Sequence, residues 1–254
     1  MGHKITFIGS GNVATNLAQA FDRAGHKILQ VISSNSDRSR KLAKRFGAYY
    51  GNSVTSVDFN ADYVILCVND ESYFNVLEEL PKGLKSVVCH TSGPVSMEVI
   101  KSYALNYGVF YPLQSLRKEK CIDFLEVPIF IEGNSVDVTE DLMKLADTIS
   151  NQTKEVSSLE REKYHLAAVF ANNFTNLMYT LAHRYLEDES LDFKNLIPII
   201  NETASRLSER DPASWQTGPA KRGDSIIMQK HIDMLEDQDL KEIYKQLSDY
   251  IRSN

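Results

Sequence analysis

Two glycines near the N-terminus have the spacing of a phosphate-binding turn. The stretch FIGSGNVA places Gly9 and Gly11 after an apolar run and Ala14 inside the amphipathic run that follows. Gly9 permits a tight turn, Gly11 lets a pyrophosphate approach the backbone, and the small Ala14 lets a helix lie close to the strand. The first amides of that helix would face the anion. The pattern predicts dinucleotide binding, and a glycine-rich turn without a ligand is the alternative.

We assign the backbone contacts of the dinucleotide to this turn. The predicted contact residues are Gly9, Ser10, Gly11, Asn12 and Val13.

The residues after the second predicted strand indicate which dinucleotide is bound. NAD sites usually carry a carboxylate there, whereas NADP sites carry small polar residues and arginine. Small polar residues stand at that position and two arginines follow them: Ser33, Ser34, Asn35, Arg38 and Arg40. Asp37, with Ser36, is expected to cap the next helix. The stretch therefore favours NADP(H), and a solvated helix face is the alternative role of the arginines.

The elements that position these residues follow from the hydrophobic pattern. Up to residue 156, β-branched runs alternate with amphipathic stretches, which predicts parallel strands joined by helices. The predicted strands are Lys4–Gly9, Ile28–Ser33, Tyr63–Val68, Ser86–His90, Gly108–Tyr111 and Pro128–Glu132. The predicted helices beyond Ser157 are Leu159–Glu187, Phe193–Ser208, one after Asp224, and Leu240–Ile251. We expect an α/β fold: a Rossmann domain with a parallel sheet at 1–156 and an all-helical domain at 157–254.

Composition narrows the classes of partner. The 254 residues carry a net charge of -6, which gives no basic field for nucleic acid. Three cysteines without CxxC spacing indicate a reducing compartment. The chain has no signal-peptide pattern and no uninterrupted apolar stretch of about 18 residues. We therefore expect a cytoplasmic protein with a small-molecule substrate, no nucleic acid, no membrane partner and no metal.

Six motifs together resemble a known family. They are GSGNVA, ADYVILCVND, HTSG, YPLQSL, YHLAAVFANNF and TGPAKRGD, in this order along the chain. With them the chain resembles the Rossmann-like proteins that carry the C-terminal domain of unknown function 2520 and are labelled NADP oxidoreductases. That family is similar in plan to deazaflavin-dependent NADP oxidoreductases, pyrroline-carboxylate reductases and 6-phosphogluconate dehydrogenases. The resemblance implies NADP(H) as cofactor and leaves the substrate undefined.

Polar residues at the ends of two middle strands would border the cofactor, because open α/β sheets bind ligands at the carboxyl ends of their strands. Val68 and Asn69 are expected beside the cofactor ribose, with Asp70 there or as a helix cap. The HTSG motif places His90 and Ser92 near the nicotinamide. A polar turn held by side-chain to backbone bonds is the alternative.

A nearly continuous apolar helix carries residues suited to move a proton. The stretch Leu166–Ala182 is apolar almost all round, which is typical of a buried helix. His165 and Asn172 are seven residues apart and would share a face. In the dehydrogenases that the chain resembles, the corresponding helix presents a lysine and an asparagine to the substrate; here His165 takes that face and Lys163 points elsewhere. Histidine can donate or accept the proton that accompanies hydride transfer. We predict catalytic roles for His165, Asn172 and Ser92, and a structural histidine is the alternative.

Substrate contacts are predicted for His90, Gln114 and Arg222. Gln114 belongs to YPLQSL and Arg222 to TGPAKRGD. Arg222 could bind a carboxylate or phosphate by paired hydrogen bonds, or form a salt bridge between domains or subunits. Asp224 is expected to cap the helix that follows.

The sequence thus predicts hydride transfer between NADP(H) and a small polar metabolite, at a carbonyl or hydroxyl, or an imine or amine. A non-enzymatic NADP(H)-binding redox sensor or regulatory protein is the alternative, because the fold serves both. The helix Leu166–Ala182 has more apolar circumference than one Rossmann face would cover, so we expect a homodimer through the helical domain.

Overall fold

The computed structural model describes residues 2–253 and contains two compact units, residues 1–172 and 173–254. We expected the domain boundary at residue 156, where the strand pattern of the sequence ends. The last strand does end at Glu155, but helix α5 (Ser158–Ala168) belongs by its contacts to the first unit. Along the sequence, the boundary between the two units falls within the π-helical stretch Val169–Phe174.

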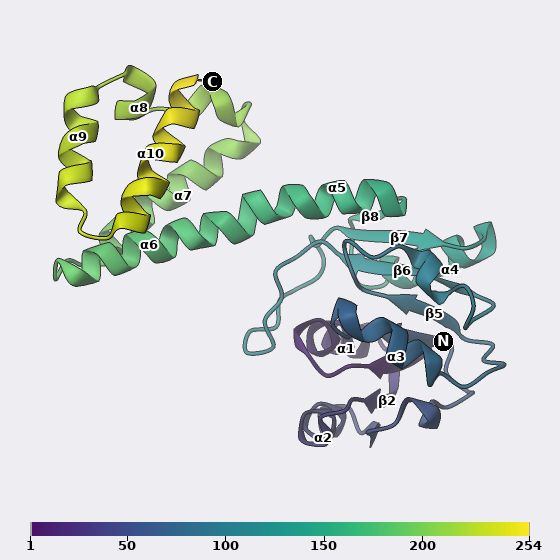
Figure 1. The fold of residues 1–254 in the computed structure, drawn as a ribbon. Coiled ribbons are helices and arrows are strands. Elements are labelled where there is room, and N and C mark those ends of the chain that lie inside the picture. Colours follow the sequence, from purple (N-terminus) through teal and green to yellow (C-terminus); the bar gives the residue numbers. More distant parts are fainter. Residues whose placement is uncertain (1, 254) are drawn as a thin grey trace. The chain divides into compact units, whose positions relative to one another are not determined.

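The first unit is built on one eight-stranded sheet in the order β3-β2-β1-β4-β5-β6-β7-β8 (Figure 1). Only the β6–β7 pair is antiparallel. The strands are β1 (Lys4–Ile8), β2 (Lys27–Ile32), β3 (Tyr49–Gly51), β4 (Tyr63–Leu66), β5 (Val87–His90), β6 (Tyr107–Pro112), β7 (Ile129–Gly133) and β8 (Thr153–Glu155). The helices between them are α1 (Asn12–Arg23), α2 (Ser36–Arg45), α3 (Tyr73–Glu78) and α4 (Val136–Asp147). The predicted α/β Rossmann fold is confirmed.

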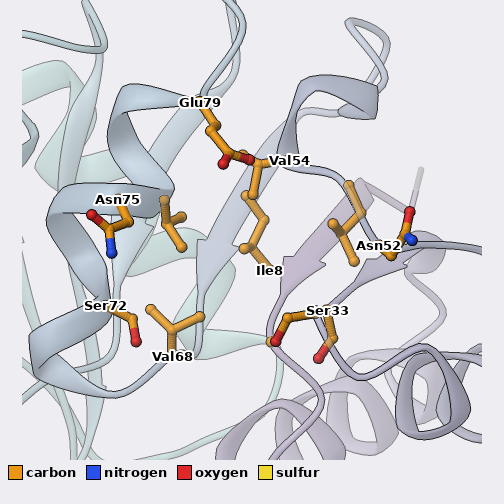
Figure 2. A pocket seen from close by; sticks show the side chains of 12 residues that line it. Ile8, Ser33, Asn52, Val54, Val68, Ser72, Asn75 and Glu79 are labelled. Carbon is orange, nitrogen blue, oxygen red and sulfur yellow. The ribbon is translucent and has the colours of Figure 1, made fainter.

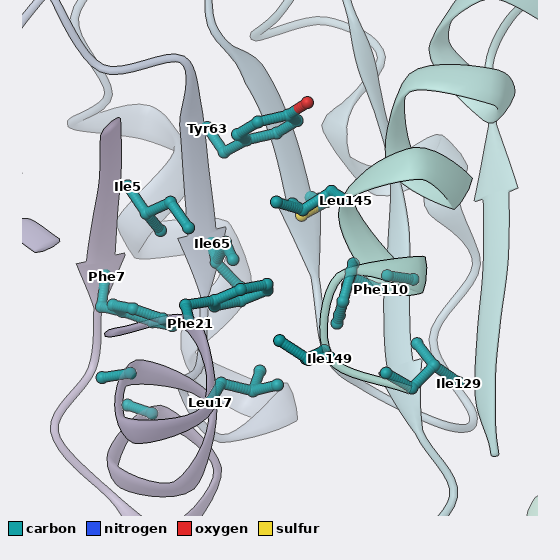
Figure 3. Close-up of a cluster of buried hydrophobic side chains, with 14 of the residues drawn as sticks. Ile5, Phe7, Leu17, Phe21, Tyr63, Ile65, Phe110, Ile129, Leu145 and Ile149 are labelled. Atoms are coloured by element: carbon teal, nitrogen blue, oxygen red, sulfur yellow. The ribbon is translucent and has the colours of Figure 1, made fainter. Parts of the chain in front are cut away.

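Alternating side chains of the strands form a core on each face of the sheet. On one face Ile5 and Phe7 of β1 pack with Phe21 of α1 and Leu145 of α4 (Figure 3). On the other face Ile8 packs with residues of β4 and α3. Because both faces are covered, the middle strands are apolar at nearly every position, as is typical of parallel sheets.

Two strands and one helix cap differ from the sequence prediction. Strands β3 and β8 have only three residues each and no clear alternating pattern, so they were not predicted. The prediction that Asp37, with Ser36, caps α2 is wrong. Asn35 is the N-cap, and its Oδ1 accepts a hydrogen bond from the Arg38 amide at 3.0 Å.

The second unit is helical, as predicted. It contains α6 (Thr175–Asp188), α7 (Ile197–Ser205), α8 (Pro219–Arg222), α9 (Ser225–Met234) and α10 (Gln238–Ser253). The carboxylate of Asp224 caps α9 by accepting from the Ile227 amide, which confirms that prediction. Among residues 2–253, no helix combines the length and the hydropathy that a membrane-spanning helix needs.

The two turn glycines are expected to respond differently to alanine. A Cβ on Gly9 would stand 2.1 Å from the Cys67 carbonyl oxygen, and Gly9 has φ +116°. Gly9→Ala should therefore lower the free energy of unfolding by about 2 kcal/mol or more. A Cβ on Gly11 would meet no atom within 4 Å, so Gly11→Ala should cost less than about 1 kcal/mol. Urea denaturation of both variants measures the difference, and equal losses would contradict this account of the turn.

Candidate functional site

The glycine turn has the geometry that a bound pyrophosphate requires. It follows the carboxyl end of β1 and leads directly into α1, whose first residue is Asn12. Gly9 adopts a positive φ that favours glycine, and its amide donates to the Ile32 carbonyl at 2.7 Å. The space beside Gly11 is open, whereas Ala14 is fully buried against the sheet. A pyrophosphate can therefore approach the backbone at Gly11 and the helix amides, and the residues present fit a dinucleotide.

A cavity of about 290 Å³ opens beside the turn, between the carboxyl ends of β1, β2 and β4 and helix α3 (Figure 2). Its apolar lining includes Ile8, Val54 and Val68, and its polar lining includes Ser33 and Asn52. Apolar walls with a few polar groups are typical of ligand sites. The structure thus brings the predicted residues Gly9, Ser33, Ser34 and Val68 together around one cavity.

Four polar residues of this cavity were not among the predicted site residues: Asn52, Ser72, Asn75 and Glu79. Ser72 and Asn75 lie in the segment after β4, so the strand-end rule that selected Val68 and Asn69 points to the same region. Asn52 directly follows β3, the short strand that was not predicted.

The end of β2 presents hydroxyl groups to the turn. Ser10 Oγ donates to Ser33 Oγ at 3.0 Å. Asn35 is occupied as the cap of α2, so its side chain oxygen serves the helix. The Arg38 side chain is exposed in the first turn of α2. The hydroxyls and the arginine, with no carboxylate at the end of β2, are suited to a 2′-phosphate.

His165 lies at the same edge of the sheet, the one formed by the carboxyl ends of the parallel strands, but beside β5 and β6. Its Nδ1 is 3.2 Å from the Tyr111 hydroxyl of β6, and the imidazole is half-buried. The ring also lies against Gly93 in the loop after β5, where a Cβ would stand 2.6 Å from Nδ1. Gly93 is therefore required for this position of the ring. Ser92, the neighbour of Gly93, is buried, and its Oγ accepts a hydrogen bond from the Val95 amide.

A fully buried arginine holds this arrangement together. Arg161 lies one turn before His165 on α5, and its Nε donates to the Gly93 carbonyl at 3.1 Å. A second nitrogen donates to the Val95 carbonyl, and a third lies 2.7 Å from the Glu132 carboxylate of β7. Ser158 donates to the same carboxylate at 2.6 Å. Arg161 thus fixes α5 on both the loop after β5 and strand β7.

His90 shapes the loop from inside the protein. The imidazole is fully buried, and its Nδ1 accepts a hydrogen bond from the Ser92 amide at 3.2 Å. Its Nε2 is buried and has no hydrogen-bond partner among the described residues. Burial, assisted by the charge of Arg161, lowers the pKa of His90 to about 3. A neutral, enclosed imidazole positions Ser92, and no face of it is open to a substrate.

The remaining predicted residues, Asn69, Gln114, Asn172 and Arg222, have exposed side chains. Asn69 is the N-cap of the short 3-10 turn Asp70–Ser72 and makes no side-chain capping bond. Asp70 does not cap α3 either, because the N-cap of that helix is Ser72. Gln114 is exposed and accepts a hydrogen bond from the Ser115 amide. Asn172 is exposed and lies in the π-helical stretch. The predicted shared face with His165 assumes 3.6 residues per turn, and a π-helix has a different period. Arg222 is exposed at the end of α8 in the second unit.

Comparison with known proteins assigns the chain to a family. Residues 4–90 match the model of the coenzyme F420-dependent NADP oxidoreductases, and residues 127–251 match the domain of unknown function 2520. A crystal structure from Bacteroides fragilis described as a "putative NADP oxidoreductase" shares 37% identity, with coverage of 100% of this chain and 99% of that chain and a TM-score of 0.95. The chain therefore belongs to this family of NADP oxidoreductases, whose cofactor is NADP(H).

More distant structures share the fold. A protein of Thermotoga maritima is 24% identical with a TM-score of 0.70, covering 98% of this chain and 97% of that one. A 1-pyrroline-5-carboxylate reductase of Streptococcus pyogenes is 17% identical with a TM-score of 0.64, covering 100% and 99%. An imine reductase of Myxococcus stipitatus, crystallised with NADP+, is 15% identical with a TM-score of 0.64, covering 98% and 92%. A search among curated proteins gave no match.

The depressed pKa of His90 predicts a loss of stability in acid. An unfolded chain takes up a proton on this imidazole near pH 6.5, whereas the folded chain does so only near pH 3. The contribution of the uncharged His90 imidazole to the free energy of unfolding is therefore fully present above pH 6.5. It decreases as the pH falls towards 3, by about 2 kcal/mol at pH 5 relative to pH 7. His90→Asn keeps an acceptor for the Ser92 amide and should remove this part of the pH dependence. Urea denaturation at both pH values measures it, and parallel losses in both proteins would contradict the assignment.

Proposed function

We propose that the protein is an NADP(H)-dependent oxidoreductase that transfers a hydride to or from a small polar metabolite, at a carbonyl or imine carbon. The observation that carries this proposal is the hydrogen-bonded pair of His165 and Tyr111. The carboxyl ends of β1, β5 and β6 point the same way in the sheet, so the pair and the glycine turn share one edge. Reduction of a carbonyl or an imine requires a proton as well as a hydride, and the pair can supply this proton.

The residues that would hold NADP(H) lie at the carboxyl ends of three strands, β1, β2 and β4. Backbone amides of Gly9 to Val13 would bind the pyrophosphate, and Ser33, Ser34 and Arg38 would bind the 2′-phosphate. Val68 and Asn69 would border the nicotinamide ribose. The bound nicotinamide supplies or accepts the hydride.

The proton would be held on Nε2 of His165. Burial raises the pKa of Tyr111, although the charge of Arg161 acts in the opposite direction, so the hydroxyl keeps its proton and donates it to Nδ1. When Nδ1 accepts from Tyr111, Nε2 is the nitrogen left to carry a hydrogen towards the substrate. Ser92 and Asn172 are the proposed further contacts of the reacting group, with Gln114 and Arg222 as substrate contacts. A small metabolite with a C=N or C=O bond suits a single N–H donor.

Turnover would separate an enzyme from a sensor. Purified protein with NADPH should be tested against a panel of cyclic imines, keto acids and aldehydes, following the absorbance of NADPH. Imines are the first choice because fold neighbours include imine and pyrroline-carboxylate reductases. Tight NADPH binding with no turnover on any compound would overturn the proposed reaction and favour a redox sensor.

Substitutions of the His165 and Tyr111 pair should change turnover and leave cofactor affinity intact. His165→Gln should lower kcat about 100-fold or more, because general acid catalysis contributes about 10²–10⁴-fold. Tyr111→Phe keeps the ring but removes the hydroxyl donor, so the nitrogen-15 NMR spectrum of His165 should lose its preference for the Nε2–H form. The Kd of NADPH should change less than about twofold in both variants. Unchanged kcat in His165→Gln would contradict the proton-donor role.

Cofactor selectivity should depend on Arg38. A charge-assisted hydrogen bond contributes roughly 1.5–3 kcal/mol, so we expect NADPH to bind at least ~10-fold more tightly than NADH, a difference of about 1.4 kcal/mol. Arg38→Ala should remove most of this difference and leave the Kd of NADH nearly unchanged. Calorimetry at one salt concentration measures both. Equal affinities in the unmodified protein would mean that Arg38 is only part of a solvated helix face.

The apolar surface of the long helical segment supports a homodimer. Leu166 and Leu177 are 60% and 44% exposed in the single chain, which is unfavourable for leucines in water. We expect light scattering at micromolar concentration to give the mass of a dimer, and Leu166→Glu with Leu177→Glu to give that of a monomer. A monomeric unmodified protein would refute the dimer. The three cysteines are free, which supports a cytoplasmic location.

A further inference from the structure

The loop between β6 and β7 is basic in an acidic protein. Arg117, Lys118 and Lys120 are three cations among four consecutive residues, whereas the whole chain has a net charge of -6. A bridge between Arg117 and Lys120 closes the segment into a tight turn. We refer to residues 117–120 as the basic turn. All three cationic side chains are exposed.

The basic turn is fixed beside the first residues of α1. The Lys118 amide donates to Asn12 Oδ1 at 3.2 Å, and Asn12 is the first residue of that helix. The side chain of Asn16, which is only 1% exposed, donates to the Arg117 carbonyl at 3.1 Å and accepts from the Ile122 amide at 3.3 Å. In Figure 1 the loop accordingly runs beside α1.

This attachment does not depend on the cationic side chains themselves. Backbone groups of the loop make the hydrogen bonds, and the flanking Leu116 and Phe124 are buried in the same hydrophobic cluster as Leu17 of α1. The charges are therefore held at the amino end of α1, while their side chains remain available for a ligand.

The basic turn keeps an excess of positive charge, because Glu119 is the one acid among its four residues. In the described part of the chain, no carboxylate forms an ion pair with its three cations. The first turn of α1 also contains no acidic residue. An anion at Gly11 would therefore meet both the helix amides and unpaired positive charge.

We propose that the basic turn is a clamp for the pyrophosphate of the dinucleotide. Lys118 reaches the anion from the loop side of the glycine turn, and Arg117 and Lys120 add positive charge around it. This inference rests on the proposed function, in which the dinucleotide binds at Gly9 to Val13. It adds a contact from a loop about 100 residues away from the glycine motif in the sequence.

The clamp and Arg38 recognise different parts of the cofactor. The 2′-phosphate occurs only in NADP(H), whereas both dinucleotides contain the pyrophosphate. Loss of the clamp should therefore weaken NADPH and NADH alike, whereas loss of Arg38 should weaken NADPH alone.

Calorimetry with three ligands tests the clamp. NADPH, NADH and inorganic pyrophosphate would be titrated into the unmodified protein, into Arg117→Gln/Lys118→Gln/Lys120→Gln, and into a control with the same change of net charge. The control is Lys4→Gln/Lys27→Gln/Lys144→Gln, whose exposed lysines lie at the amino ends of β1 and β2 and on α4. Thermal unfolding of each variant checks that the fold is retained.

We expect the clamp variant to lose at least ~10-fold in affinity for both dinucleotides at low ionic strength, and less at 1 M salt, where charges are screened within about 3 Å. Binding of inorganic pyrophosphate should weaken in parallel. The control should change each Kd less than about twofold.

Two results would overturn the clamp alone: clamp and control variants with equal affinities, or a clamp variant that weakens only NADPH. If neither dinucleotide binds the unmodified protein, the proposed cofactor use fails, and the clamp fails with it.

Discussion

The first unit depends on the buried guanidinium of Arg161. Removing this charge from water is costly, so it must be compensated by hydrogen bonds and by an opposite charge. It donates to two carbonyls of the loop after β5 and to Glu132 of β7, which also accepts from Ser158. A buried ion that loses its partner costs about 3–5 kcal/mol. This penalty favours one arrangement of α5, the loop and β7 over alternatives.

The position of His165 follows from that constraint. Arg161 and His165 are four residues apart on α5, so fixing the first also sets the side of the helix on which the second lies. The Gly93 carbonyl bonds Arg161 while the missing side chain of Gly93 makes room for the imidazole. One glycine thus serves the structural bond and the candidate reactive group. The Tyr111 hydroxyl completes the surroundings of Nδ1.

The fold was predictable because its signals are local. Six strands with β-branched runs, the glycine turn and the long C-terminal helices all appear in the sequence at the correct places. Strands β3 and β8 were missed because three residues cannot show a period, and because the exposed Tyr49 and Tyr50 do not form an apolar run. The predicted cap of α2, Asp37 with Ser36, lies one to two residues after the observed cap, Asn35. All three are good N-cap residues, so the sequence does not distinguish them.

The site was predictable only in part, because its essential contacts are distant in sequence. His165 attracted notice as a polar residue at the start of an apolar stretch. Arg161 and Tyr111 did not, since a charged residue on a helix is normally solvated and an aromatic residue in a strand is normally core. Arg161 contacts Gly93, which is 68 residues away in the sequence, and Tyr111 contacts His165, which is 54 residues away. His90 was expected to touch a substrate, but its complete burial is a property of the assembled sheet that no local pattern contains.

The central claim is that one edge of the sheet holds both the dinucleotide and the proton donor. A crystal structure of the complex with NADP+ tests it most directly. The account predicts the pyrophosphate on the turn from Gly9 to Val13, the 2′-phosphate beside Ser33 and Arg38, and the nicotinamide ring in contact with the loop that carries Ser92 and Gly93, next to His165. A nicotinamide ring that lies away from that loop, with no contact to His165, would contradict it.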